Sequence, residues 1–170
     1  MSENTNDTLE IQTQGAVLTT PKSTAASIFD PWLYEKKIDE QGETGKRFVY
    51  AQGIVVTLSP ASASRYLKVQ EAAQNAIRRA YGKRNIPPKV ADDTLIDCIV
   101  AGILLGWDNG TLKKPGAPVF PARDGSQMAF NPDNATKVLT DLKRFRDWVI
   151  ATAWVDDNFG DDVEELQTKN

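Results

Sequence analysis

The sequence predicts an α+β fold, mainly α, with three principal helices and a small N-terminal antiparallel β-sheet. Apolar residues at three- and four-residue spacing predict helices at about 60–81 and 132–155. A shorter run at about 92–105 is apolar nearly all round after Asp97, which is typical of a central core helix. Residues 32–58 are rich in β-branched and aromatic side chains, and we expect the sheet there.

The length and composition suit one compact domain. The chain has 170 residues, of which 41% are hydrophobic and 25% charged, values typical of a globular protein. Residues 1–27 are polar and lack an apolar period, which predicts a disordered N-terminal arm. We expect a single globular domain at 28–160, followed by a flexible acidic tail at 161–170.

The N-terminal part of the domain has the pattern of a β meander. Residues 32–38 are interpreted as an edge strand and the glycine-containing segment 41–45 as a turn. Residues 47–58 follow as a β-rich segment. Gly53 in its middle indicates a bulge or the break between two strands.

Capping signals place the predicted helices. Ser59-Pro60 favours a helix start, and Gly82 favours its end. The second helix is capped by Asp92 or Asp93 and ends at Gly106. Asn131-Pro132 opens the third helix.

The segment between the last two helices is predicted to be a loop that can contain a hairpin. Asp108-Asn109-Gly110 and Asp124-Gly125 are turn signals. Three prolines between residues 115 and 121 exclude a helix.

The residue inventory excludes the common catalytic chemistries. The chain has no histidine and one cysteine, Cys98, which lies in an apolar run and is interpreted as a core residue. Zinc sites lack their preferred ligands, and phosphate-binding glycine loops are missing. The acidic stretch from Asp156 fails the spacing of a calcium loop, because glycine does not fall at its sixth position. We therefore predict a protein that is not an enzyme, with no catalytic, cofactor-binding or metal-binding residues.

Charge and hydropathy limit the classes of partner that we expect for this chain. The net charge is −3, and the densest basic cluster, around Arg78, Arg79, Lys83 and Arg84, lies at a helix end, where cations complement the helix dipole. Nucleic-acid binding through this cluster is the weakest of three functional hypotheses, because a footprint needs a broader basic face. The longest apolar run, 98–107, is about half of the roughly 20 residues needed to cross a bilayer. We expect no membrane contact and a cytoplasmic location.

Aromatic residues supply the structural anchors and the interface candidates. We predict Trp107, Phe130, Phe145 and Trp148 as anchors of the core. Trp154 follows Trp148 by six residues, which places the two about 120° apart on a helix, so Trp154 is the better candidate for an exposed interface residue. The predicted protein-interface residues are Trp154, Phe159, Asp161, Asp162, Glu164 and Glu165.

One stretch resembles a known family. It runs from an apolar segment ending in Leu104-Leu105-Gly106-Trp107, through Phe130-Asn131-Pro132-Asp133-Asn134-Ala135, to a long helix followed by Phe159. This pattern resembles the tail assembly chaperones of long-tailed bacteriophages, with its specific part confined to residues 95–160.

The resemblance implies a function and partners. Such proteins bind the tape-measure protein, keep its hydrophobic helices soluble, help recruit tail-tube subunits during tail assembly in the host cell cytoplasm, and do not remain in the virion. Family members are often also made in a C-terminally extended form by ribosomal frameshifting. The alternative is a structural virion protein, such as a tail-completion, tail-tube or head–tail connector component. Length and helical content also permit a homo-oligomer.

Overall fold

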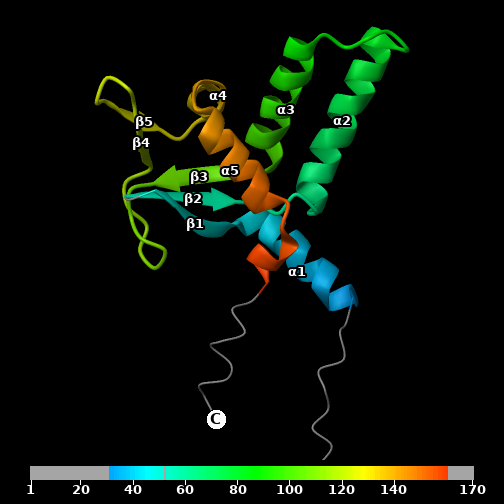
Figure 1. Ribbon diagram of the computed structural model, residues 1–170. Coiled ribbons are helices and arrows are strands. Elements are labelled where there is room, and N and C mark those ends of the chain that lie inside the picture. Colours follow the sequence, from blue (N-terminus) through cyan, green and yellow to red (C-terminus); the bar gives the residue numbers. More distant parts are fainter. Residues whose placement is uncertain (1–30, 52, 161–170) are drawn as a thin grey trace, which may run out of the picture.

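The computed structural model describes residues 31–51 and 53–160, which form five α-helices, one 3₁₀ helix and two small antiparallel sheets (Figure 1). The predicted architecture of three helices and one N-terminal sheet is therefore wrong, although the mainly helical content is confirmed. The predicted arm 1–27 and tail 161–170 lie outside the described residues. The elements are α1 (Pro31–Thr44), β1 (Lys46–Ala51), β2 (Ile54–Leu58), α2 (Ser64–Tyr81), α3 (Pro88–Gly102), β3 (Leu104–Asp108), β4 (Val119–Pro121), β5 (Gln127–Ala129), α4 (Pro132–Asp141), α5 (Lys143–Ala153) and the 3₁₀ helix η1 (Asp156–Phe159).

The segment predicted as an edge strand, 32–38, is part of helix α1. Its aromatic and aliphatic composition favours a strand, but the residues that face the core follow helical spacing. Tyr34, Ile38 and Gly42 are four residues apart, and the last two are buried. Pro31 suits the first helical position, because its missing N–H would have no partner there.

Strands β1, β2 and β3 form one antiparallel sheet in that order. Of the two alternatives indicated at Gly53, a bulge or a break, the structure has the break between two strands: β1 pairs with β2 as a hairpin, and Gly53 has a φ of +75° in its turn. The third strand is supplied from residues 104–108, far along the chain. Because β3 is far from β1 and β2 in the sequence, this sheet is not the local N-terminal meander that was predicted.

Helices α2 and α3 form a hairpin that projects away from the sheets (Figure 1). Helix α2 begins at Ser64 rather than at Ser59-Pro60. Residues 59–61 are instead hydrogen-bonded to segments far along the chain. The Ser59 N–H donates to the Ile103 carbonyl at 2.8 Å, and the Ala61 N–H donates to the Ala153 carbonyl at 2.8 Å. The cap of α2 comes from α1, where the Asp39 carboxylate accepts from the Ser64 N–H at 2.8 Å.

The central helix is shifted relative to its predicted range. Helix α3 begins at Pro88, ends at Gly102, and is followed at once by strand β3. Gly106 and Trp107, predicted at the helix end, therefore lie in a strand. Apolar runs of this kind fit a buried helix and a buried strand equally well, which is why the boundary could not be found from periodicity.

The long helix predicted at 132–155 is two helices. The entry at Asn131-Pro132 is confirmed, since the Asn131 side chain accepts from the Asn134 N–H at 2.9 Å. The helical path breaks at Leu142, whose φ of −110° and ψ of +78° are not helical. Without glycine or proline at that point, the apolar stripe continues across the break and gives no signal of it.

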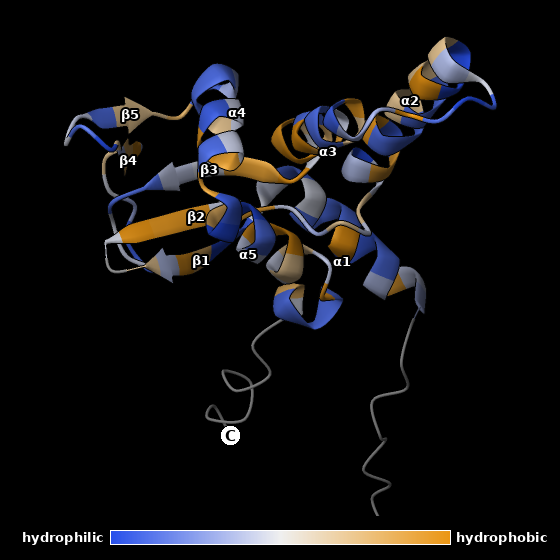
Figure 2. Ribbon diagram, turned by 45° about the horizontal axis from the view of Figure 1, so that its top comes forward, coloured by the Kyte–Doolittle hydropathy of each residue, from blue (hydrophilic) through white to orange (hydrophobic). Residues whose placement is uncertain are grey.

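Aromatic side chains join the sheet to α5 and η1. Tyr50 on β1 contacts Phe145 and Trp148, with ring centroids 4.8 Å and 5.0 Å away. Phe48 contacts Phe159 at 5.3 Å. Figure 2 shows apolar residues along β2 and in parts of β3 and α3, and buried residues of all three elements belong to the hydrophobic core. In the described residues, no helix is both long and apolar enough to span a bilayer.

Candidate protein-binding cleft

The sheet has a second face, opposite to Phe48 and Tyr50, and this face carries the candidate site. Because side chains alternate along a strand, Arg47 and Val49 of β1 lie on that face with their cross-strand partners Thr57 and Val55 of β2. Asp108 of β3 pairs with Val55 and shares the same face. The loop between β3 and β4 folds back over these residues, so that Val55 is only 1% exposed.

An ion pair ties this loop to the sheet. The Arg47 guanidinium contacts the Asp108 carboxylate at 2.8 Å (Nη1 to Oδ2) and 3.0 Å (Nη2 to Oδ1). Arg47 Nη2 also donates to the Thr111 carbonyl at 2.7 Å. One guanidinium therefore holds the end of β3 and the following loop at the same time.

Asp108 also organises the backbone of the loop. Its Oδ1 accepts hydrogen bonds from the Gly110 N–H at 2.7 Å and the Gly116 N–H at 3.0 Å. Burial by itself raises the pKa of Asp108, but these two amides and Arg47 more than offset it and hold the pKa below its ordinary value. The carboxylate is thus charged at neutral pH and fixes the loop by accepting hydrogen bonds from both of these amides.

Two glycines allow the loop to close this tightly. A Cβ on Gly110 would collide with the Gly116 N–H and the Lys114 carbonyl, and one on Gly116 would collide with Gly110 and Asn109. The close approach also brings the Asn109 side chain to the Ala117 N–H, from which it accepts a hydrogen bond of 2.8 Å. Residues 109–117 are therefore held by hydrogen bonds among themselves and to Arg47.

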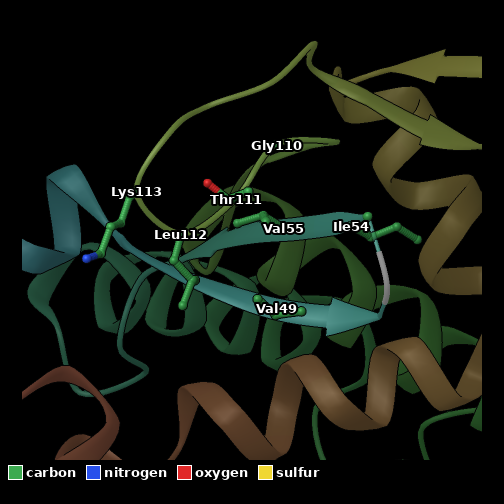
Figure 3. Close-up of a pocket in the computed structure, with 8 residues that line it drawn as sticks. Val49, Ile54, Val55, Gly110, Thr111, Leu112 and Lys113 are labelled. Carbon is green, nitrogen blue, oxygen red and sulfur yellow. The ribbon is translucent and has the colours of Figure 1, made fainter.

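The fixed loop and the β1–β2 hairpin enclose an apolar cleft of about 460 Å³ (Figure 3). Leu112 on the loop projects over the strands, Lys113 lies at one end, and Ile54 lies at the other. Val49 is 52% exposed and Leu112 is 53% exposed, although both are aliphatic. The cleft is lined by Val49, Gly53, Ile54, Val55, Gly110, Thr111, Leu112 and Lys113.

A second, more polar groove lies between α1, the start of α2 and η1. It has a volume of about 350 Å³, with Tyr34, Ile38 and Leu67 beside the carboxylates of Asp39 and Asp156. Both carboxylates already accept hydrogen bonds inside the protein, Asp39 from Ser64 and Asp156 from Ser62. Two of the carboxylates that line the groove are therefore already engaged within the protein.

The predicted interface residues are separated by the structure. Trp154 is 46% exposed at the end of α5, where its ring contacts that of Tyr66 at 5.3 Å. Phe159 is 1% exposed and packs on Phe48, which corrects its prediction as an interface residue: the 3₁₀ turn of η1 directs its ring into the core. Asp161, Asp162, Glu164 and Glu165 lie outside the described residues.

The four predicted anchors lie in or against the core. Trp107 is 2% exposed, and its indole N–H donates to the Met128 carbonyl at 3.1 Å, which fixes the β4–β5 hairpin to β3. The Trp107 ring contacts Phe130 at 5.0 Å. Phe145 is fully buried and contacts Trp148 at 6.1 Å.

Reactive groups are not concentrated at the cleft. Cys98 lies in the core as predicted, at 5% exposure, and burial followed by the charge of Asp97 raises the pKa of its thiol. Across residues 31–51 and 53–160, no group of acidic, cysteine or histidine side chains is arranged to hold a metal ion. The lining of the cleft is mostly aliphatic.

The residues that build the cleft could not be recognised from the sequence alone. Asp108-Asn109-Gly110 was interpreted only as a turn, and Arg47 and Val49 only as strand residues. The available signal was the combination of two glycines six residues apart after an aspartate. That pattern does not reveal the partner of the aspartate, because Arg47 lies 61 residues away.

A model of the family described as YdaY prophage protein matches residues 61–170, that is 110 of the 170 residues. The match includes the loop wall of the cleft and the segments that carry the chaperone resemblance, and it begins after the β1–β2 wall. No curated protein and no solved structure matches the chain.

Proposed function

Because the chain belongs to the YdaY prophage protein family and is therefore phage-derived, we propose that it is a tail assembly chaperone. In this proposal it binds an apolar segment of the tape-measure protein in the host cytoplasm and acts without catalysis. The tail-tube protein is its second proposed partner, recruited to the same complex. The resemblance of residues 95–160 to tail assembly chaperones supports the choice of partner.

The observation that carries the proposal is the apolar cleft between the β1–β2 hairpin and the loop 109–117. Two aliphatic side chains, Val49 and Leu112, are about half exposed on its walls. Exposed apolar residues around a concavity are typical of a surface that a partner covers. An amphipathic helix fits such a surface by inserting apolar side chains from one face.

The hydrogen bonds of the loop preorganise the cleft. Asp108, Arg47 and the close contact of Gly110 with Gly116 fix the position of Leu112 before any partner arrives. A site that is already ordered loses less conformational entropy when it binds. The cleft therefore gains affinity from the loop although the loop residues that order it are polar.

The size of the cleft suits a transient complex. Burial of one leucine or phenylalanine contributes about 2 kcal/mol. Two or three such anchors contribute about 4 to 6 kcal/mol before the entropy lost on association is subtracted, so the dissociation constant is expected to be no tighter than roughly tens of micromolar. A chaperone must release its client as the tail is completed, and an affinity of this order permits release.

Co-expression with the tape-measure protein of the same prophage tests the proposal. The chaperone account predicts that the tape-measure protein becomes soluble and co-purifies with this chain, while mass spectrometry of purified particles finds no stoichiometric copies of the chain. Stoichiometric copies in the particle would instead establish the alternative, a structural virion component. Failure to form a complex or to improve solubility would exclude the chaperone function.

A further inference from the structure

The end of the α2–α3 hairpin carries a concentration of positive charge. Residues 78–89, which we call the basic tip, contain five basic residues and no acidic one, in a chain whose net charge is −3. Since the tip contributes +5 to that total, the remaining residues together carry −8. The basic residues of the tip are Arg78, Arg79, Lys83, Arg84 and Lys89.

The basic tip is an ordered surface at the end of the hairpin that lies away from the sheets (Figure 1). The Arg84 N–H donates to the Tyr81 carbonyl at 2.9 Å, which closes a turn directly after α2. Pro87 and Pro88 lead into α3, and each proline ring fixes the backbone angle φ of its residue. A partner therefore meets side chains whose backbone is already restricted, and less conformational entropy is lost on binding.

Only two of the five cations are engaged within the protein. Lys89 pairs with Asp93 at 2.6 Å. The Arg84 guanidinium donates to the Ala80 carbonyl at 3.3 Å, at the C-terminal end of α2, where a cation complements the helix dipole. The other three are exposed, and across residues 31–51 and 53–160 they take part in no ion pair. These uncommitted cations are Arg78, Arg79 and Lys83.

An aliphatic side chain is exposed in the same segment. Ile86 is 41% exposed, and it lies between Arg84 and Lys89 in the sequence. Protein interfaces combine apolar residues, which become buried, with a rim of polar and charged ones. Phosphate groups would leave this isoleucine uncovered, and the −8 carried by the remaining residues repels a long polyanion. The basic tip therefore fits a protein surface better than a nucleic acid.

We propose that the basic tip binds an acidic surface of a partner protein, one on which carboxylates flank an apolar residue. The carboxylates pair with the three uncommitted cations, two of which are arginines that can hold a carboxylate through two parallel hydrogen bonds. The apolar residue of the partner covers Ile86. The apolar cleft lies on the β1–β2 hairpin, away from the basic tip, so the inference does not depend on the occupant of the cleft (Figure 1).

An NMR titration of the isotope-labelled full chain with a synthetic peptide provides the test. The probe is an alanine-rich helical peptide with one leucine and with glutamates three and four residues from it, so that they share one face. The amide signals of residues 78–89 should shift at about 0.05 M salt. Binding should weaken at least about fivefold at about 0.5 M salt, because exposed ion pairs are screened by salt. A matched peptide with glutamine in place of glutamate should bind at least about fivefold more weakly than the probe at low salt.

Three variants separate the contributions of charge and apolar contact. R79E/K83E reverses two of the uncommitted charges and should abolish the shifts. K137E/K143E changes the net charge by the same amount at two exposed lysines of α4 and α5, and it should bind like the wild type. Ile86→Ser keeps every charge and should weaken binding severalfold. The spectrum of each variant without peptide shows whether it is folded.

Three results would overturn the inference: no shift of residues 78–89 with the glutamate peptide, equal binding of the glutamine peptide, or a folded R79E/K83E variant that binds like K137E/K143E. Full affinity of Ile86→Ser would contradict the apolar contact. A duplex DNA oligonucleotide is titrated under the same conditions. If it binds the basic tip more tightly than the glutamate peptide does, the partner is a nucleic acid and the proposal is wrong.

Discussion

Arg47 and Asp108, 61 residues apart in the sequence, form a two-point ion pair on the sheet face that carries the apolar cleft. The pair joins the edge strand β1 to the end of β3 across β2. The side chains of Arg47 and Asp108 are only 23% and 9% exposed, so solvent screens the pair much less than a surface pair. Because the same two residues bind Thr111, Gly110 and Gly116, the shape of the cleft depends on this pair.

Replacing Asp108 with alanine should destabilise the protein. The substitution leaves the Arg47 guanidinium without its ion-pair partner and two loop amides without an acceptor, at a cost of about 3 kcal/mol. Chemical denaturation measures this difference in the free energy of unfolding. Asp93→Ala removes the exposed pair with Lys89 and is the matched control; it should change stability little, and an equal loss for both variants would contradict the role given to Asp108.

The stability of the protein should also depend on pH through Asp108. The folded state lowers the pKa of this carboxyl below its ordinary 3.8, so the unfolded state binds the proton first. The stabilisation is complete above pH 3.8 and is lost as the pH falls through the lower pKa of the folded state. The difference in unfolding free energy between wild type and Asp108→Asn should therefore be constant from neutral pH to about pH 5 and shrink below pH 3.8. A difference that does not change between pH 5 and pH 3 would exclude this titration.

A methyl group at Gly116 should disrupt the loop. Its Cβ would overlap the backbone of Gly110 and the side chain of Asn109, and relieving such a clash costs about 2 kcal/mol. Gly106→Ala is the control, because a Cβ at Gly106 meets no atom within 4 Å. Thermal unfolding should show a lower melting temperature for Gly116→Ala and little change for Gly106→Ala; the opposite order would show that the loop tolerates expansion.

Removing the Asp39 carboxylate should weaken the start of α2. Asp39 on α1 accepts from both the N–H and the hydroxyl of Ser64, and these bonds lower the pKa of Asp39. Loss of a helix cap costs about 1 kcal/mol. Asp39→Ala should show this loss in denaturant unfolding, whereas Glu40→Ala, which removes an exposed ion pair with Lys36, should not. Equal stability of the two variants would mean that α2 does not depend on the cap.

The sequence predicted correctly those features whose conformation is set by residues close together in the chain. The hairpin broken at Gly53, the cap at Asn131 and the turn at Asp124-Gly125 all depend on residues within a few positions of each other. The turn is closed as the pattern indicates, with the Asp124 side chain accepting from the Ser126 N–H at 2.9 Å. These signals were sufficient because each one fixes the conformation of its own segment.

Elements that depend on distant partners were not predictable in the same way. Helix α1 has the composition of a strand, and its apolar face is defined by contacts with α2 and η1. Residues 104–108 form a strand because β2 offers an edge to pair with. The break at Leu142 and the pair of Arg47 with Asp108 are likewise decided by tertiary packing, which overrides local propensity.

If the cleft beside Leu112 binds a segment of the tape-measure protein, the affinity for that protein should depend on the side chain at this position. Leu112→Glu places a charge in the apolar cleft, whereas Leu67→Glu places one at a leucine of similar exposure in the second groove. Isothermal titration calorimetry with a soluble peptide that carries an apolar helical segment of the tape-measure protein should show at least about tenfold weaker binding for Leu112→Glu, since an unpaired charge costs more than 1.4 kcal/mol in a site that binding desolvates. Leu67→Glu should bind like the wild type. Unchanged affinity for Leu112→Glu, or a loss confined to Leu67→Glu, would contradict the claim.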